Sequence, residues 1–221
     1  MMDDFTKRSI DEFLDAVAQR APTPGGGSVA GAVGALACAL ARMVAAYSIG
    51  KNTNPSVRDR TESVLDRLRR ADEILRSLVT QDTVAYAAMG AAGKAARENP
   101  ATKSAEPEPH ASACATSYQD AVLAAVAVPM ETAAVASHTL AAMDEWKEFA
   151  NRRLLSDLGA AAVLAEAAAR ASWYMVAVNL PELVDAATRT RLRGHIAEAV
   201  AHCDGHRRSI EAFVRRHLEN T

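Results

Sequence analysis

The helix breakers of this chain are gathered in a few short segments, and this distribution constrains the fold more than any other feature. Of the 221 residues, 11 are glycine and 8 are proline, and long stretches between them are uninterrupted. Hydrophobic residues make up 49% of the chain and aromatic residues only 5%. The apolar side chains are therefore mainly Ala, Leu and Val, which favours closely packed helices over sheets. We predict an all-α fold, a single-domain helical bundle with long antiparallel helices formed by residues 1–221.

Hydrophobic periodicity and the positions of the breakers predict where the helices begin and end. Ser56 and Ser156 are expected to cap the third and fifth helices, and Pro129 is expected to kink or break the fourth. The polar, proline-containing segment 98–109 is expected to be an exposed loop. The predicted helices span about 9–20, 28–50, 56–97, 111–150, 156–179 and 187–218.

The second predicted helix, 28–50, is almost entirely apolar and about long enough to span a bilayer. However, Arg42 lies in its interior, and its residues are mostly Ala and Gly rather than Leu and Ile. A helix that buries every face at the centre of a soluble bundle fits this composition as well, and we favour that interpretation. The acidic N-terminal residues also lack a signal-peptide pattern. We therefore expect a cytoplasmic protein that does not bind membranes.

The charged and metal-ligating residues exclude several classes of function. A net charge of −2, from 25 basic and 27 acidic residues, gives no indication of nucleic-acid binding. The three cysteines, Cys38, Cys114 and Cys203, match neither a disulfide framework nor a zinc motif. His202 and His206 are spaced like two ligands on one helix face, but no third ligand is evident. We expect no metal and no cofactor.

The glycine triplet Gly25-Gly26-Gly27, followed by Ser28, is the most unusual local feature. Glycines at the start of a helix leave backbone N–H groups open where the helix dipole favours an anion, so a carboxylate or phosphate could dock there. Alternatively, the triplet is a tight turn that lets the chain pass close to a neighbouring helix. The strand and GKS/T ending of a nucleotide-binding P-loop are missing.

Asp82 is the leading candidate for acid–base chemistry. It falls on the same helix face as Leu75, Val79 and Tyr86, so its carboxyl group should be partly removed from water. Burial raises the pKa of a carboxyl group toward the range that is useful for proton transfer. Asp72 lies on the same face, and a structural role is the alternative for either aspartate. Periodicity alone does not choose between the two.

Several short motifs, in a fixed order along the chain, resemble those of a known family. The specific part is PTPGGGS at 22–28 followed by Gly50-Lys51; the other motifs are weak singly. The chain resembles the cyclodeaminase/methenyltetrahydrofolate cyclohydrolase family, which includes the C-terminal domain of formiminotransferase-cyclodeaminase and stand-alone cyclohydrolases. The motifs that carry the resemblance are 22–30, Met43-Val44, Ile49-Gly50-Lys51, Asp82 to Tyr86, Val128-Pro129, Asn151 with Ser156-Asp157, and Val178-Asn179-Leu180.

This resemblance implies an enzyme that hydrolyses or cyclises a C–N bond in a one-carbon tetrahydrofolate. It also implies an all-α homodimer whose active site contains no metal. Asp82 would be the acid–base residue, and Lys51 would donate a proton or anchor the acidic tail of the folate. By the same matching, the substrate pocket would contain Gly25, Gly26, Gly27, Ser28, Tyr86, Asn151, Asp157 and Asn179. On the pattern alone, a helix cap followed by a first-turn acid is a sufficient interpretation of Ser156-Asp157 and the one that we favour.

Three departures from the family pattern keep other functions open. Asn54 stands where an aromatic residue is usual, 98–116 replaces a basic segment, and Met175-Val176-Ala177 replaces Asn-Val-Arg. Lost basic residues would weaken binding of the negatively charged glutamyl tail. The alternatives are a C–N cyclase or hydrolase acting on a non-folate imine or amine in specialised metabolism, and a non-catalytic helical binding or scaffold protein. The last of these would have a filled space beside Asp82 instead of a cleft.

Overall fold

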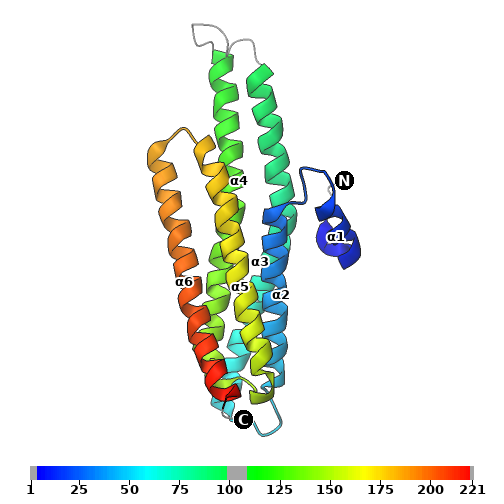
Figure 1. Ribbon diagram of the computed structural model, residues 1–221, viewed down its shortest axis with the longest axis vertical. Coiled ribbons are helices and arrows are strands. Elements are labelled where there is room, and N and C mark those ends of the chain that lie inside the picture. Colours follow the sequence, from blue (N-terminus) through cyan, green and yellow to red (C-terminus); the bar gives the residue numbers. More distant parts are fainter. Residues whose placement is uncertain (1–3, 99–108, 220–221) are drawn as a thin grey trace.

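Every regular element in the described ranges, residues 4–98 and 109–219, is helical in the computed structural model. The predicted all-α bundle is thereby confirmed, and its long helices run beside one another (Figure 1). The α-helices are α1 (Ile10–Ala18), α2 (Gly26–Tyr47), α3 (Pro55–Glu98), α4 (Pro109–Trp146), α5 (Leu155–Asn179) and α6 (Ala186–Leu218). Short 3-10 helices are η1 (Phe5–Lys7), η3 (Lys147–Phe149), η4 (Arg152–Leu154) and η5 (Leu180–Glu182).

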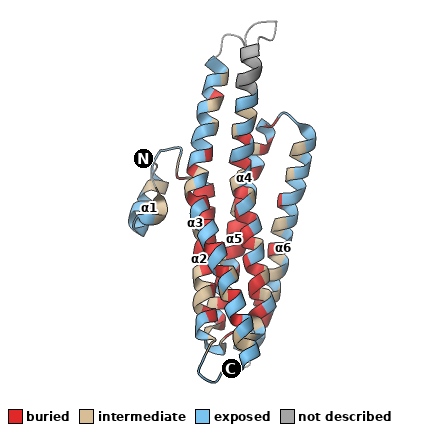
Figure 2. Ribbon diagram, turned by 180° about the vertical axis from the view of Figure 1, so that it is seen from behind, coloured by how far each residue is buried: buried red, intermediate tan, exposed pale blue. Residues whose placement is uncertain are grey.

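The long helices form two layers. In the view of Figure 1, α2 and α5 lie side by side in front of α3 and α4, and α6 runs along α4 and α5. α3 and α4 continue beyond the N-terminus of α2 as a projecting pair, while α1 stands to the side of the bundle. Buried residues are concentrated where the helices overlap, below the projecting pair (Figure 2). The N-terminus of α2 therefore lies beside the place where α3 and α4 leave the bundle.

α2 packs so closely against α3 that two of its glycines leave little room for a side chain. A Cβ atom on Gly31 would lie 3.2 Å from the backbone oxygen of Leu75 and 3.3 Å from the backbone nitrogen of Val79. A Cβ atom on Gly34 would lie 3.0 Å from Cδ2 of Leu75. These small residues set the separation of the two helices. They thereby fix the position of the first turn of α2 against α3.

Asp72 and Asp82 share a helix face in the sequence but have different environments. Asp72 is 4% exposed. Its Oδ2 accepts a hydrogen bond from Arg42 Nη1 at 2.6 Å, and its Oδ1 accepts one from Arg76 Nε at 2.8 Å. Both carboxylate oxygens are therefore engaged, and the Arg42 bond ties α2 to α3. Asp72 has a structural role, which leaves Asp82 as the candidate for chemistry.

Only one side of α2 is buried, which corrects the expectation of a helix buried on every face. Leu36 is 58% exposed and Tyr47 is 69% exposed. By length and composition alone, three helical stretches could cross a membrane: Gly26–Tyr47, Thr116–Phe149 and Arg152–Glu182. In the most apolar part of each, 50%, 50% and 44% of the residues are buried inside the bundle.

Several details at helix boundaries differ from the sequence-based expectations. The side chain of Asn54 accepts hydrogen bonds from the backbone N–H and the hydroxyl of Ser56, both at 2.9 Å, so Asn54 and not Ser56 caps α3. Ser156 lies within the first turn of α5, which has no side-chain cap. Pro129 lies inside an unbroken α4, which packs against α3, α5 and α6. The expected loop at 98–109 falls mostly outside the described residues.

The packing of α2 on α3 predicts opposite effects for two Gly→Ala changes. Gly31→Ala should lower the free energy of unfolding by about 1–3 kcal/mol, because the new methyl group meets backbone atoms that cannot move aside. Gly194→Ala should raise it by about 0.5–1 kcal/mol, because Gly194 lies inside α6 and nothing is within 4 Å of its Cβ position. Urea unfolding measures both. Equal stabilisation by the two changes would show that α2 and α3 can separate without cost.

Candidate active site

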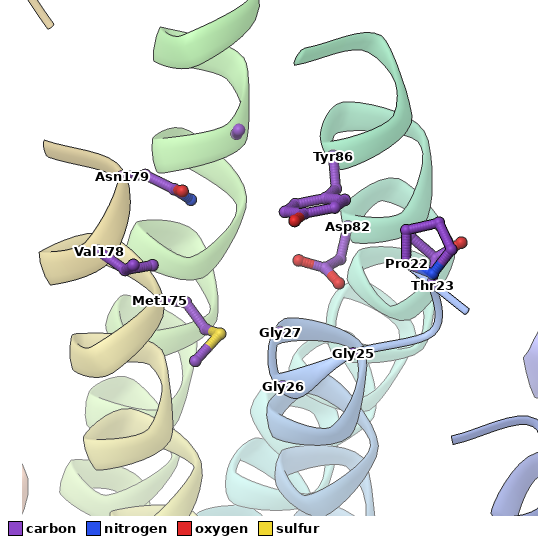
Figure 3. Close-up of a pocket in the computed structure, with 11 residues that line it drawn as sticks. Pro22, Thr23, Gly25, Gly26, Gly27, Asp82, Tyr86, Met175, Val178 and Asn179 are labelled. Carbon is purple, nitrogen blue, oxygen red and sulfur yellow. The ribbon is translucent and has the colours of Figure 1, made fainter. Parts of the chain in front are cut away.

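A cavity of about 260 Å³ opens at the N-terminus of α2, where α3 and α4 leave the bundle. Its walls are the segment before α2, the first turn of α2, α3 and the last turns of α5, with one residue from α4 (Figure 3). The fold therefore brings together segments from both halves of the chain. The lining residues are Pro22, Thr23, Gly25, Gly26, Gly27, Asp82, Tyr86, Ala125, Met175, Val178 and Asn179.

Asp82 projects from α3 into this cavity, directly above the first turn of α2 (Figure 3). Ser28 is fully buried, and its Oγ donates a hydrogen bond to Asp82 Oδ2 at 2.8 Å. A Cβ atom on Gly27 would lie 2.0 Å from Asp82 Oδ1. The carboxyl group therefore occupies the space that any side chain at position 27 would need. The Gly27-Ser28 pair leaves room for the carboxyl group and then holds it in place.

The first turn of α2 also acts on Asp82 electrostatically. The N-cap residue of α2 is Gly25, which has no side chain, so no side-chain hydrogen bond caps the first turn of the helix. The positive end of the α2 dipole favours a negative charge at this point. The carboxyl group found at this turn is the protein's own Asp82, so the glycine triplet lets a neighbouring helix pass closely. Docking of a separate carboxylate or phosphate at this turn stays a prediction.

The pKa of Asp82 is raised above its ordinary value of 3.8 because the side chain is largely removed from water. Hydrogen bonds from the side chain and backbone of Ser28 oppose this effect but do not cancel it. A carboxyl group with a raised pKa exchanges protons at a pH closer to neutrality. Asp82 thus combines a fixed orientation with an altered affinity for protons, and it faces an open cavity.

The other walls of the cavity carry a phenol, an amide and apolar groups. Tyr86 lies one turn after Asp82 on α3, and its ring stands beside the carboxyl group (Figure 3). Asn179 extends toward the cavity from the opposite wall, at the end of α5. Met175 lies one turn earlier on α5, close to Gly26. A ligand in the cavity would therefore lie between the carboxyl group on one side and an amide on the other.

Most of the predicted site residues meet at this cavity. Gly25, Gly26 and Gly27 form one edge, and Asp82, Tyr86 and Asn179 contribute side chains. Ser28 lies behind Asp82 and does not line the cavity; it positions the carboxyl group.

Lys51, Asn151 and Asp157 lie at the other end of α2 and do not line the Asp82 cavity within one chain. Lys51 is an exposed residue of the turn between α2 and α3, and Asp157 lies in the first turn of α5. α2 has 22 residues, so its two ends are separated by about 33 Å. Within one chain the structure therefore does not bring these three residues to the Asp82 cavity, and their place in the substrate pocket stays a prediction.

The hydrogen bonds of Asn151 give it a structural role. Its backbone N–H donates to Ser48 Oγ at 2.9 Å, and its side-chain Nδ2 donates to the carbonyl oxygen of Tyr47 at 3.1 Å. Its Oδ1 accepts a hydrogen bond from the backbone N–H of Arg153 at 3.0 Å. These contacts join the C-terminus of α2 to the turn before α5. Asn151 thereby fixes the relative position of the two front-layer helices.

Sequence reasoning did not select several residues that line the cavity: Pro22, Thr23, Ala125, Met175 and Val178. Pro22 and Thr23 belong to the PTPGGGS motif, so the motif itself was the available signal. Met175 precedes Asn179 by one helical turn, and this spacing could have indicated a shared face. Ala125 of α4 gives no signal, since it is one of many alanines on a long helix.

His202 and His206 do not form part of a metal site in the described residues. Nδ1 of His206 lies 2.9 Å from Asp144 Oδ2, and Lys147 Nζ donates to Asp144 Oδ1 at 2.5 Å. In residues 4–98 and 109–219, no group of three or more His, Cys, Asp or Glu side chains could hold a metal ion. The His206–Asp144 contact instead links α6 to α4.

Comparison with known proteins adds independent information to this geometry. The profile of the formiminotransferase-cyclodeaminase family matches residues 9–198. Formimidoyltransferase-cyclodeaminase of Rattus norvegicus is 31% identical over 189 residues, which cover 86% of this chain but only 34% of the rat protein. The chain thus spans about a third of that relative. Methenyltetrahydrofolate cyclohydrolase of Methylorubrum extorquens is 32% identical over 200 residues, covering 87% of this chain and 91% of that protein.

A solved structure shows the same fold. The crystal structure of formiminotetrahydrofolate cyclodeaminase from Thermotoga maritima superposes with a TM-score of 0.83 and 29% sequence identity. The superposition covers 96% of this chain and 98% of that chain. The family match includes the glycine turn, Asp82 and the end of α5, which are the parts that build the cavity. From its sequence and its fold, the chain belongs to the formiminotransferase-cyclodeaminase family.

Proposed function

We propose that this protein is an enzyme that breaks or closes a C–N bond in a one-carbon tetrahydrofolate. It would act as a methenyltetrahydrofolate cyclohydrolase or a formiminotetrahydrofolate cyclodeaminase, with Asp82 as the proton shuttle. The observation that carries the proposal is the Asp82 carboxyl group, which faces a cavity, is held by Ser28 and has a raised pKa. The names of the relatives favour a folate over a non-folate imine or amine.

In the cyclohydrolase direction, the substrate carries a cationic five-membered amidinium ring. Water adds to the bridging carbon while the Asp82 carboxylate accepts one of its protons. The tetrahedral intermediate collapses when the C–N bond breaks, and the protonated Asp82 returns the proton to the leaving nitrogen. The hydroxyl group loses its remaining proton to water and becomes the formyl oxygen. The negative charge of the carboxylate also stabilises the bound cationic ring before water attacks. The reaction changes no oxidation state, so the proposal includes no cofactor and gives no role to a metal.

In the cyclodeaminase direction, the folate amine that closes the five-membered ring attacks the carbon of the protonated formimino group, and ammonia leaves. Asp82 would take the proton from the attacking nitrogen and pass it to the leaving nitrogen. Both directions need one carboxyl group that accepts a proton and then gives it back, which a raised pKa assists. The same residue can thus serve either reaction, and the choice between them depends on which substrate the cavity admits.

The cavity argues against a non-catalytic scaffold, because a scaffold has no reason to keep an open space beside a half-buried acid. At about 260 Å³, the cavity is slightly smaller than the pockets that enclose drug-sized ligands, which begin at about 300 Å³. It suits the ring system at the reacting end of a folate. The aminobenzoyl and glutamyl parts would extend beyond it.

We also propose that the protein is a homodimer that associates through the front layer. The outer side of α2 carries no polar residue: Gly26, Val29, Val33, Leu36, Leu40, Met43 and Tyr47 are all exposed or half-buried. They recur at alternating steps of three and four, the spacing by which paired helices interlock. A contiguous apolar face of this kind marks an interaction surface.

The dimer proposal predicts that Leu36→Glu yields a monomer. A charge buried at the centre of an apolar interface costs more than the interface contributes. Light scattering on the purified protein measures the mass. Val184→Glu is the matched control, because Val184 is 77% exposed in the turn before α6 and lies away from the outer face of α2. A wild-type monomer that floats with lipid vesicles would contradict the proposal and assign the face to membranes instead.

The acid–base role predicts that Asp82→Asn lowers kcat by about 10²–10⁴-fold, since the amide cannot shuttle a proton. Loss of methenyltetrahydrofolate absorbance and release of ammonia from formiminotetrahydrofolate measure the two reactions. The matched control is Asp66→Asn, on the exposed side of the same helix, where the carboxylate pairs with Arg69. Wild-type rates in Asp82→Asn would remove Asp82 from the mechanism.

The raised pKa of Asp82 predicts a pH-dependent effect on stability. Above pH 3.8 the unfolded carboxyl group ionises readily while the folded one resists, so ionisation costs stability as the pH rises. Asp82→Asn should therefore raise the free energy of unfolding at pH 7, with a gain that shrinks toward pH 3.8.

Asp144→Asn serves as the control with the opposite sign. Although burial acts to raise it, the pKa of Asp144 is held below its ordinary value by hydrogen bonds from Lys147 and His206. Its ionised form stabilises the fold at neutral pH, so Asp144→Asn should lower the free energy of unfolding at pH 7. The two curves of stability against pH should diverge as the pH rises. Parallel curves would show that burial does not control the ionisation of Asp82.

A further inference from the structure

A second hollow, of about 290 Å³, lies between α3 and α4 where these helices run side by side (Figure 1). It shares no lining residue with the Asp82 cavity. Its lining residue nearest to Asp82 along α3 is Ile74, about 12 Å earlier along the helix axis. The proposed reaction therefore does not use this hollow. Its lining residues are Arg67, Leu68, Arg70, Ala71, Ile74, Val135, His138, Thr139 and Ala142.

The floor of this hollow is apolar. Leu68 and Ala142 are each 1% exposed, and Val135 is also buried. Thr139 is buried as well, and its hydroxyl group already donates a hydrogen bond to the carbonyl oxygen of Val135 at 2.9 Å. Ile74, at 38% exposed, adds apolar surface that is open to solvent. The floor therefore suits the apolar body of a ligand and not a polar group.

Basic side chains stand around this apolar floor. Arg70 on α3 and His138 on α4 are exposed, and neither makes a hydrogen bond or an ion pair within the part of the chain that the structure describes. Arg67 differs, because its Nη1 lies 2.6 Å from Oε2 of Glu145. None of the described residues that line the hollow is acidic. The charges around the hollow therefore favour an anionic group.

The ion pair between Arg67 and Glu145 limits the length of the ligand. A further hollow, of about 430 Å³, lies along the same two helices, and Arg67 lines both. Glu145 lines the larger one, so its carboxylate would repel an anionic group that extended in that direction. At about 290 Å³, the smaller hollow is close to the lower limit for pockets that enclose drug-sized ligands, about 300 Å³. It therefore suits a short ligand.

We propose that the hollow lined by Arg70 and His138 binds a small amphipathic carboxylate, a compact apolar body with one carboxylate group. The apolar body lies on Leu68, Ala71 and Val135. The carboxylate meets the guanidinium group of Arg70, whose planar fork donates two parallel hydrogen bonds to such a group. His138 supplies a further donor from α4. The ligand thus bridges α3 and α4 at a site separate from the Asp82 cavity.

Calorimetric titration with cinnamate, a planar apolar body with one carboxylate, tests the class of ligand. Cinnamate should bind with a Kd of about 1 mM or lower. Cinnamyl alcohol, which lacks the charge, and acetate, which lacks the apolar body, should each bind about 10-fold more weakly or worse. Equal binding of either control, or no binding of cinnamate, would overturn the proposal.

Two neighbouring arginines provide a matched pair of variants. Arg70→Gln should weaken cinnamate binding by about 10-fold or more, because the charge-assisted hydrogen bonds are lost. Arg69→Gln should leave the Kd unchanged, since Arg69 is equally exposed but pairs with Asp66 at 2.6 Å and does not line the hollow. Both side chains are on the surface, so neither change disturbs the core. Equal losses in the two variants would reveal a general attraction to basic residues of α3 and would overturn the proposal.

Methyl NMR locates the bound cinnamate without relying on activity. With the isoleucine δ1 methyl groups labelled, the signal of Ile74 should shift during the titration, while that of the fully buried Ile210 should stay in place. Asp82→Asn should bind cinnamate with the wild-type Kd, because the two sites are separate. A stationary Ile74 signal at saturation, or a Kd that changes in Asp82→Asn, would place the ligand elsewhere and overturn the proposal. These outcomes do not depend on whether the protein turns over a folate.

Discussion

The contact between the first turn of α2 and Asp82 on α3 is the interaction on which the rest of the site depends. The Ser28 hydroxyl holds one carboxylate oxygen, and the missing side chain at Gly27 makes room for the other. This contact is possible because Gly31 and Gly34 allow α2 to approach α3 closely. The buried Asp72–Arg42 pair then fixes the two helices against each other farther along. Helix packing and acid–base chemistry are therefore set by one run of small residues.

The environment of Asp82 shows how one fold gives two aspartates on the same helix different properties. Asp72 contacts two guanidinium groups and has a structural role. The Asp82 carboxyl group contacts the Ser28 hydroxyl and the N-terminus of α2 but, within the described residues, no cation. Burial therefore raises its pKa. A proton shuttle needs this incomplete stabilisation of its charged form.

Much of the fold could be predicted from the sequence, because hydrophobic periodicity and breaker positions report directly on helices. The PTPGGGS motif and Asp82 could be linked through their resemblance to a family, but periodicity could not separate Asp82 from Asp72. That distinction depends on Arg42, which comes from another helix. Sequence motifs also carry no distances, so Lys51 and Asn151 could not be placed at the far end of a 22-residue helix. Which residue caps α3 depends on the backbone geometry at the start of the helix. Asn54 and Ser56 are both of a type that can cap a helix, so the sequence alone does not choose between them.

The pH–rate profile of folate turnover, compared between the wild type and Ser28→Ala, tests the central claim most directly. If Asp82 is the base, kcat/KM for methenyltetrahydrofolate should rise with pH through an inflection above 3.8. Ser28→Ala should move that inflection to higher pH, because the hydroxyl group that favours the charged carboxylate is gone. An inflection that stays in place while the rate alone changes would contradict the assignment of Asp82 as the residue that carries the proton.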